Sequence, residues 1–284
     1  MRTIRTVAEL RTELAASRRA DRTIGLVPTM GAFHAGHVSL MQRARQDSDV
    51  VVVSLFVNPA QFGPSEDLAA YPRDEARDAA IAEQAGVDVL FAPPVAEVYP
   101  DGFQTSVAVG ALAEPLEGAQ RPGHFDGIAT VVTKLLNMVG PDVAFFGQKD
   151  AQQALIVRRV VRDLDIPVRI EVCPTVREAD GLAMSSRNAY LAPAERERAI
   201  ALRRALDAAE QAVAAGERDA SAVATAARAA MNRFDVEPEY LALVAADTLA
   251  PVDTIDGEVL VALAARVGSA RLIDNVLITA NGRP

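Results

Sequence analysis

Short runs rich in β-branched residues alternate with longer segments of helical apolar spacing through roughly the first 174 residues. Five of these runs are predicted strands, at residues 23–27, 50–57, 87–92, 143–146 and 168–173. Runs that are apolar on both faces are typical of a parallel sheet covered by helices. The alternation therefore predicts an α/β fold with a doubly wound parallel sheet, whose ligands bind beyond the carboxyl ends of the strands.

The segments between these strands have recognisable helix boundaries. Residues 6–9 form a capping box, and the segment 72–86 opens with Pro-Arg-Asp and ends at a glycine. Residues 128–139 and 150–164 have the apolar spacing of helices packed on a sheet.

The rest of the chain has a different pattern. An Ala/Arg/Glu-rich helix is predicted for residues 193–216 and a second helix for 220–234, followed by strand-like pieces at 240–244, 259–265 and 271–278. We therefore expect two domains. Residues 1–175 form a Rossmann-like domain, and residues 176–284 form a smaller C-terminal α+β lid domain with a small antiparallel sheet.

Composition restricts the partners of this chain. A formal net charge of −9 and a pI near 5.0 disfavour nucleic acid, because phosphate neutralisation needs a positive surface. No apolar run approaches the ~18 residues that cross a bilayer, so we expect no membrane partner. The single cysteine, Cys173, permits no internal disulfide and is interpreted as core filler rather than as a nucleophile. We expect a cytoplasmic protein.

Residues 28–37, PTMGAFHAGH, hold two of the three histidines in the chain. His34 and His37 follow a predicted strand where a helix begins, and the exposed N–H groups of a helix N-terminus attract phosphate. The glycines in this segment let backbone approach a ligand. One alternative is a glycine turn with two solvated imidazoles. A zinc site is a second alternative, weakened because the remaining histidine and the cysteine show no paired ligand spacing.

Other polar groups follow two more predicted strands. Asn58 and Gln61 offer neutral amides after residues 50–57, although an Asn-Pro turn with an incidental glutamine explains that segment alone. A glycine, a cation, an acceptor and an amide follow residues 143–146: Gly147, Lys149, Asp150 and Gln153. Asp150 equally suits the role of a helix N-cap.

A loop at the predicted domain boundary, GLAMSSRN at residues 181–188, adds two hydroxyls and a fixed cation. Together these segments supply the donors that a triphosphate needs in an otherwise acidic chain. They also supply neutral hydrogen-bonding groups for a small polar substrate. The combination indicates activation of a carboxylate by ATP.

The chain resembles the pantothenate synthetase (pantoate–β-alanine ligase) family, a relative of the H-x-G-H nucleotidylyltransferases and class I aminoacyl-tRNA synthetases. Six motifs carry the resemblance, in the family's order, from Val27 to Leu191: VPTMGAFHAGH, FVNPAQFG, EDLAAYPR, RPGHFDGIATVVTKLLN, FFGQKDAQQ and PTVREADGLAMSSRN. The last hundred residues match the family only in general character.

The resemblance implies ATP- and magnesium-dependent condensation of (R)-pantoate with β-alanine through a pantoyl adenylate, with release of pyrophosphate and then AMP. It implies a catalytic role for His34, His37, Lys149 and Arg187, with His37 as general acid. It also implies the residues that bind ATP: Met30, Gly31, Ala32, Phe33, His34, Ala35, Gly36, His37, Gly147, Gln148, Lys149, Asp150, Val176, Met184, Ser185, Ser186 and Arg187.

The same resemblance assigns Gln61 and Gln153 to pantoate, with Asn58 beside them, and places the entry of β-alanine at Gln61. Magnesium is expected on the triphosphate, as is usual for this ion, and no protein ligand is assigned to it. The resemblance also implies a homodimer.

Three rival functions are weighed against this one. A nucleotidylyltransferase of the same superfamily shares the H-x-G-H element but needs neither paired glutamines nor an amine acceptor. A tRNA-dependent synthetase is disfavoured by the acidic charge. A non-catalytic nucleotide-binding regulator requires loss of reactive groups, yet the two histidines, Lys149 and Arg187 are all present.

Overall fold

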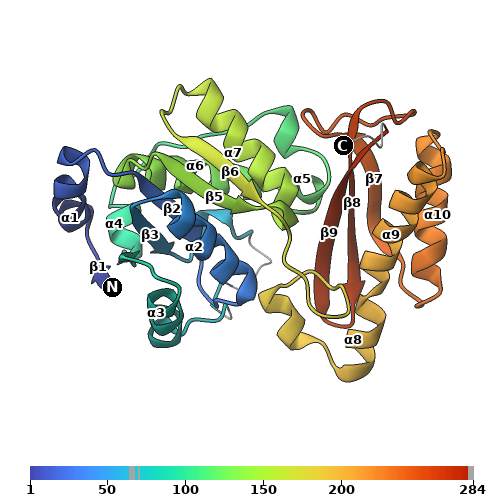
Figure 1. Cartoon of the computed structure of the whole chain (residues 1–284), viewed down its shortest axis with the longest axis horizontal. Coiled ribbons are helices and arrows are strands. Elements are labelled where there is room, and N and C mark those ends of the chain that lie inside the picture. The colour runs from blue at the N-terminus through green and yellow to red at the C-terminus, as the bar shows by residue number, and fades with distance from the viewer. Residues whose placement is uncertain (64–67, 70, 281–284) are drawn as a thin grey trace. The chain divides into compact units, whose positions relative to one another are not determined.

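The computed structural model describes residues 1–63, 68–69 and 71–280, which fall into two compact units (Figure 1). The first unit comprises Met1–Gln148 and Gln152–Pro174, and the second comprises Lys149–Ala151 and Thr175–Pro284. The predicted motif at residues 66–73 lies partly outside the described residues. Each unit has its own sheet.

The sheet of the first unit is parallel throughout its described strands, in the order β1-β4-β3-β2-β5-β6. Its strands are β1 (Arg2–Ile4), β2 (Ile24–Thr29), β3 (Val50–Leu55), β4 (Val89–Phe91), β5 (Val143–Gly147) and β6 (Arg169–Cys173). The prediction of a doubly wound parallel sheet is confirmed. Strand β1 was not predicted, because three residues are too short to show a period.

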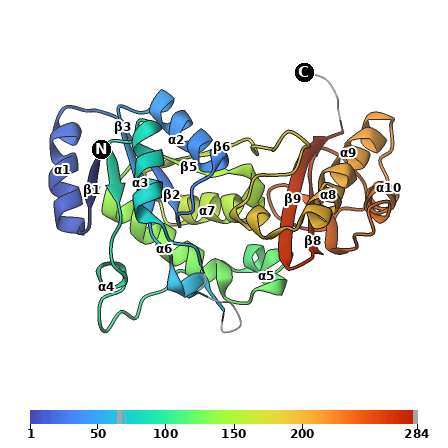
Figure 2. The same ribbon diagram turned by 90° about the horizontal axis from the view of Figure 1, so that it is seen from below.

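Helices cover both faces of this sheet: α1 (Val7–Arg19), α2 (Ala35–Asp47), α3 (Glu75–Gln84), α6 (His124–Val139) and α7 (Ala151–Asp163). The two views place α2 and α3 on one face and α6 and α7 on the other (Figures 1 and 2). Thr6 caps α1, as predicted, by accepting from Glu9 N at 3.2 Å. The helix predicted from residue 72 begins at Glu75 instead, because Asp74 takes the N-cap and accepts from Arg77 N at 3.0 Å.

The core of the first unit is formed by the central strands and the helix faces packed on them. Val51, Val53 and Phe145 have no exposed surface, and fully burying a side chain of this size contributes about 1.5–3 kcal/mol. Cys173 lies in the same core, and burial raises the pKa of its thiol. A buried thiol of raised pKa is a poor nucleophile, which agrees with its interpretation as core filler.

The strand order creates a switch point between β2 and β5. These two strands are neighbours, yet β2 connects onward to β3 on one side while β5 connects to β6 on the other. Loops leave the carboxyl ends of adjacent strands in opposite directions at such a point, and ligands of doubly wound folds bind there. The histidine segment follows β2, the Asn58–Gln61 segment follows β3, and Gly147 ends β5.

The second unit packs helices on a three-stranded antiparallel sheet, which confirms the predicted α+β character. Its elements are α8 (Pro193–Ala199), α9 (Ala201–Ala214), α10 (Ala220–Asn232), β7 (Pro238–Ala245), β8 (Glu258–Val267) and β9 (Ala270–Thr279). The prediction of one helix over residues 193–216 is wrong. Ile200 (φ −63°, ψ −14°) is both the C-cap of α8 and the N-cap of α9, so the segment forms two helices.

Candidate active site

The turn after β2 is built around two residues with positive φ, Gly31 (φ 93°) and Ala32 (φ 53°). A buried carboxylate stabilises it. Asp78, on α3, accepts Ala32 N at Oδ2 and Phe33 N at Oδ1, each at 2.8 Å, and is 1% exposed. These two hydrogen bonds from backbone amides to one carboxylate hold the turn in its positive-φ conformation. Asp78 was not predicted from the sequence; a charged residue on the buried face of a predicted helix was the available signal.

Gly31 cannot be replaced without moving this turn. A Cβ there would lie 2.8 Å from Leu55 Cδ1 and 2.9 Å from Asp78 Oδ2, and the positive φ itself disfavours any side chain. The glycine therefore allows β3 and α3 to approach the segment that carries the two histidines.

The two histidines cap the start of α2 with their own rings. His34 Nδ1 accepts from Gly36 N at 3.1 Å, and His37 Nδ1 accepts from His34 N at 3.3 Å. The ring centroids lie 4.2 Å apart. Because a backbone N–H can only donate, each Nδ1 is unprotonated, and the neutral imidazole carries its hydrogen on Nε2.

The geometry limits which backbone amides of this segment are available to a phosphate, and the prediction that the segment binds ATP stays a prediction. The amides of Ala32, Phe33, His34 and Gly36 all donate to groups of the protein. The donors that this turn presents are the Nε2–H groups of the two imidazoles, which project from a helix N-terminus.

Beyond β3, Asn58 caps the short 3₁₀ helix Pro59–Gln61 and is 1% exposed. Its Oδ1 accepts from Tyr99 Oη at 2.7 Å and from Ala60 N at 3.3 Å. Its Nδ2 donates to Gln61 Oε1 and to Gly127 O, both at 3.1 Å. An asparagine amide makes four hydrogen bonds at most, so Asn58 has no capacity left for a ligand. The structure gives Asn58 a role different from the direct substrate contact expected of it.

Gln61 is positioned from the side of α6 as well. A Cβ on Gly127 would lie 2.3 Å from Ala60 O, so only glycine lets α6 pack this closely on the 3₁₀ helix. His124 Nδ1 lies 2.8 Å from Gln61 O, and Arg121 Nη1 lies 2.7 Å from His124 Nε2. Since the carbonyl accepts and the guanidinium donates, His124 carries its hydrogen on Nδ1, opposite to His34. It orients the Gln61 backbone.

Two adjacent glutamines after β5 have different environments. Gln152 is 5% exposed and holds the segment 112–117, donating to Leu112 O (2.9 Å) and Pro115 O (2.8 Å) and accepting from Glu117 N (3.1 Å). Gln153 is half-buried and, as the next residue on α7, points about 100° further around the helix than Gln152. A Cβ on Gly147 would meet nothing within 4 Å, which leaves the backbone there open to a ligand.

The predicted ATP residues of the second unit lie on a tight hairpin and the turn that follows it. Met184 N donates to Val176 O at 3.0 Å, which sets these two apolar residues side by side. Ser185 then caps the 3₁₀ helix Ser186–Tyr190 by accepting from Arg187 N at 3.2 Å. In the same unit, Lys149 Nζ lies 3.6 Å from Asp150 Oδ1.

This hairpin is anchored by charged groups that were not predicted from the sequence. Arg177 forms a two-pronged ion pair with Asp274 (2.6 and 3.0 Å), whose side chain is 1% exposed. Asn188 donates to Glu178 Oε1 at 2.6 Å. Arg196 pairs with Asp180 and lowers the pKa of that carboxyl. The loop that carries Ser185 and Arg187 is therefore fixed at several points within its own unit.

Metal-binding clusters and membrane spans are both absent from the described residues. No group of three or more His, Cys, Asp and Glu side chains among them is arranged to hold a metal ion. Within the same part of the chain, no helix combines the length and apolarity that a bilayer crossing requires.

The sheet with its switch point, the paired imidazoles after β2 and the oriented glutamine after β3 define an α/β protein with a doubly wound parallel sheet and an H-x-G-H motif at the carboxyl end of β2. The family model described as pantoate-beta-alanine ligase matches residues 2–277. The chain belongs to the pantoate–β-alanine ligase family, as its motifs predicted.

Relatives agree over almost the whole chain. The pantothenate synthetase of Moorella thermoacetica is 53% identical over 282 residues, which cover 99% of this chain and 100% of the relative. That of Agrobacterium fabrum is 55% identical, covering 98% and 96% respectively. A crystal structure of pantothenate synthetase from Thermus thermophilus superposes with a TM-score of 0.92 at 49% identity, covering 97% of this chain and 99% of the other.

A further structure is informative for its ligands. Pantoate-beta-alanine ligase from Francisella tularensis, crystallised with beta-gamma ATP and beta-alanine, superposes with a TM-score of 0.80 at 34% identity, covering 98% of this chain and 97% of the other.

Proposed function

We propose that this chain condenses pantoate with β-alanine at the expense of ATP, through an enzyme-bound pantoyl adenylate. The observation that carries the proposal is the arrangement of donors at the ends of adjacent strands. Two Nε2–H imidazoles follow β2, and an oriented glutamine follows β3. Family membership and the ligands of the Francisella tularensis relative support the same reaction.

In the first step a pantoate carboxylate oxygen attacks the α-phosphorus of ATP, and pyrophosphate leaves. Charge accumulates on the phosphate oxygens in the transition state, so donors that are already oriented contribute most. We assign His34 and His37 to that role as hydrogen-bond donors through Nε2–H. The general-acid role that the resemblance implies for His37 becomes, for a neutral ring, a hydrogen bond from Nε2–H to the oxygen that departs with pyrophosphate. In other enzymes, removing one such donor costs about 2.7–4 kcal/mol of transition-state stabilisation.

Fixed cations complete the phosphate site in this proposal. Lys149 and Arg187 neutralise phosphate oxygens, assisted by the hydroxyls of Ser185 and Ser186. Ser185 Oγ already accepts from Arg187 N, so its own hydrogen is left to donate. The remaining residues expected at the nucleoside and at the loop are Met30, Gly31, Ala32, Phe33, Ala35, Gly36, Gly147, Gln148, Asp150, Val176 and Met184.

The side chains proposed to bind pantoate are uncharged, and the chemistry of the first step explains why. Gln61 and Gln153 orient pantoate through amide hydrogen bonds, whereas a two-pronged arginine would stabilise the ground-state carboxylate and slow its attack. Asn58 acts on the substrate through Gln61, since its own hydrogen bonds are all used inside the protein. In the second step the amine of β-alanine, entering beside Gln61, attacks the adenylate carbonyl and AMP leaves.

Magnesium enters this scheme as part of the co-substrate, MgATP. Its role is to neutralise phosphate charge, and it is coordinated mainly by phosphate oxygens and water. No side chain of this chain is assigned to the ion. Because the reaction consumes ATP, we propose the cytoplasm as its compartment.

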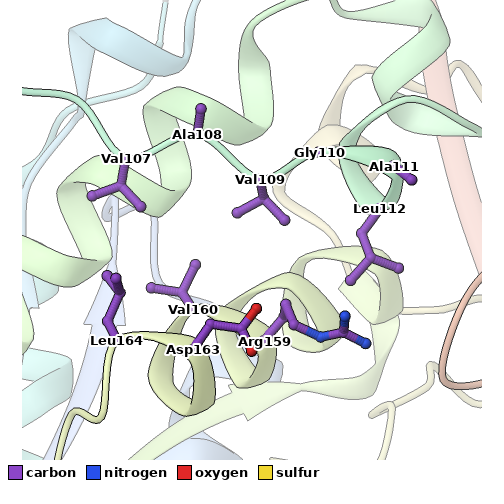
Figure 3. Close-up of a pocket in the computed structure, with 10 residues that line it drawn as sticks. All are labelled: Val107, Ala108, Val109, Gly110, Ala111, Leu112, Arg159, Val160, Asp163 and Leu164. Atoms are coloured by element: carbon purple, nitrogen blue, oxygen red, sulfur yellow. The ribbon is translucent and has the colours of Figure 1, made fainter.

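The family's homodimer is also proposed for this chain. A hollow of about 220 Å³ in the first unit lies between residues 107–112 and the end of α7, and its lining combines apolar side chains with Arg159 and Asp163 (Figure 3). Val107 and Val109 point into it, and Leu164 beside it is 50% exposed. A second copy covering this surface would bury it. Light scattering on Leu164→Glu should then report half the mass of the unmodified chain.

Pyrophosphate release tests the reaction. With ATP and pantoate alone, the enzyme should release about one equivalent of pyrophosphate per site, and AMP should appear only when β-alanine is added. A nucleotidylyltransferase would instead turn over without an amine and accumulate a dinucleotide. Continuous pyrophosphate release in the absence of β-alanine, or no release with pantoate, refutes the proposed function.

A further inference from the structure

A chain of hydrogen bonds in the first unit joins Tyr99 to Gln61. Tyr99 Oη donates to Asn58 Oδ1 at 2.7 Å, and Asn58 Nδ2 donates to Gln61 Oε1 at 3.1 Å. Tyr99 ends the short helix α4 (Val95–Val98) and is far from Gln61 in the sequence. The phenol therefore reaches the substrate glutamine only through Asn58.

The direction of these hydrogen bonds is fixed at Asn58, the residue between Tyr99 and Gln61. Ala60 N–H can only donate, so the atom of Asn58 that faces it must be the oxygen. Gly127 O can only accept, so the atom that faces it must be the nitrogen. It follows that Asn58 offers a donor to Gln61, and that Gln61 turns its carbonyl oxygen toward Asn58. The other end of that amide, Nε2 with its two hydrogens, remains for a ligand.

We propose that Tyr99 is a positioning residue, which acts through Asn58 to hold Gln61 as a hydrogen-bond donor toward the oxygens of the acid substrate. The inference deepens the proposed function and rests on it. It assigns the Gln61 subsite to acceptor groups, namely carboxylate or hydroxyl oxygens. A protonated amine can only donate and so cannot accept from Gln61 Nε2–H. The β-alanine that enters beside Gln61 is therefore not held by this group.

The surroundings of Tyr99 suit a permanent donor. Burial raises the pKa of its phenol to about 12, so the hydroxyl keeps its hydrogen at any pH at which the enzyme works. Its ring packs against Phe56 (centroids 6.2 Å apart) and Phe103 (5.1 Å). The ring contacts hold the phenol in place, and they would persist in a phenylalanine variant.

The test measures initial rates of pyrophosphate release at saturating β-alanine, so that the enzyme turns over, while pantoate and ATP are varied separately. Tyr99→Phe removes one hydrogen bond and keeps the ring. We expect the KM for pantoate to rise about 3- to 10-fold, the value of one such bond, while the KM for ATP changes less than about twofold. Asn58→Asp places an oxygen opposite Gln61 Oε1, which forces the Gln61 amide to flip and turn its NH₂ group toward residue 58. We expect kcat/KM for pantoate to fall about 100-fold. Tyr240→Phe, on β7 of the second unit, controls for loss of a phenol hydroxyl elsewhere.

A double substitution separates this role from a merely structural one. In a Gln61→Ala background, followed in single turnovers at excess enzyme, adding Tyr99→Phe should cause no further loss, because the group that Tyr99 positions is absent. An unchanged pantoate KM in Tyr99→Phe, equal rises in both KM values, or the same loss in the Gln61→Ala background overturns the inference. If the unmodified enzyme does not use pantoate, the proposed function fails instead.

Discussion

Replacing Asp78 by asparagine removes a single negative oxygen from the turn that carries both histidines. Asparagine keeps the shape of the side chain but can accept from only one of the Ala32 and Phe33 amides. Its NH₂ group then faces the other amide hydrogen. A hydrogen bond to a charged group contributes about 1.5–3 kcal/mol, and a buried unsatisfied donor costs about 1–3 kcal/mol. The two figures overlap, because losing the bond is what leaves the donor unsatisfied, so they are not simply added. We expect a loss of about 3 kcal/mol.

Thermal unfolding measures that loss directly. For a unit of this size each kcal/mol shifts the midpoint by about 2–4 °C, so Asp78→Asn should unfold about 6–12 °C below the unmodified chain. Asp74→Asn is the matched control on the same helix. Asp74 is an exposed N-cap that accepts Arg77 N, and asparagine caps as well as aspartate, so its midpoint should hardly move.

Activity gives a second readout, below the unfolding temperature of the variant. The turn sets the position of both imidazoles, and misplacement of a reacting group by about 1 Å can cost ~100-fold. We expect kcat for pyrophosphate release to fall at least ~10-fold in Asp78→Asn and to stay near normal in Asp74→Asn. A variant at position 78 with an unchanged midpoint and unchanged kcat would refute the role given to this carboxylate.

Three further predictions concern single groups. His37→Ala should lower the rate of pyrophosphate release by ~100-fold or more without unfolding the chain, as measured by steady-state kinetics and circular dichroism. Gly127→Ala should raise the pantoate KM and lower stability, because the new Cβ would lie 2.3 Å from Ala60 O; urea unfolding and kinetics measure both. Arg196 lowers the pKa of Asp180 from its ordinary value of 3.8, so this pair stabilises the fold above about pH 4 and the stabilisation is lost as the pH falls. In Arg196→Gln, urea midpoints between about pH 3 and pH 5 should therefore depend less on pH.

The three strand-end segments could be found from the sequence because the fold itself assembles them. Once β2, β3 and β5 are recognised as parallel strands, their carboxyl ends must meet at one edge of the sheet. Polar residues directly after those strands are then neighbours, whatever their separation in the chain. The pattern needed only the hydrophobic runs and the glycines beside them.

Contacts that depend on side-chain direction could not be found in that way. Asp78 and Tyr99 come from helices outside the recognised strand ends, and nothing local marks which group each one meets. Asn58 was recognised as important, yet its role was assigned to the ligand because the sequence does not show that all four of its hydrogen bonds are used. Hydrogen-bond accounting requires coordinates.

His37 has two roles that can be separated because they use different ring nitrogens. Its Nδ1 accepts His34 N and closes the start of α2, and its Nε2–H is the donor proposed for the phosphate. Asparagine can place an oxygen near the position of Nδ1 but has nothing at Nε2, whereas glutamine can place a donor near Nε2 and leaves the His34 amide without an acceptor. If the donor dominates catalysis, His37→Gln should retain more activity than His37→Asn, and His37→Asn should retain more stability. Equal activity in the two variants would mean that His37 contributes mainly by shaping the turn.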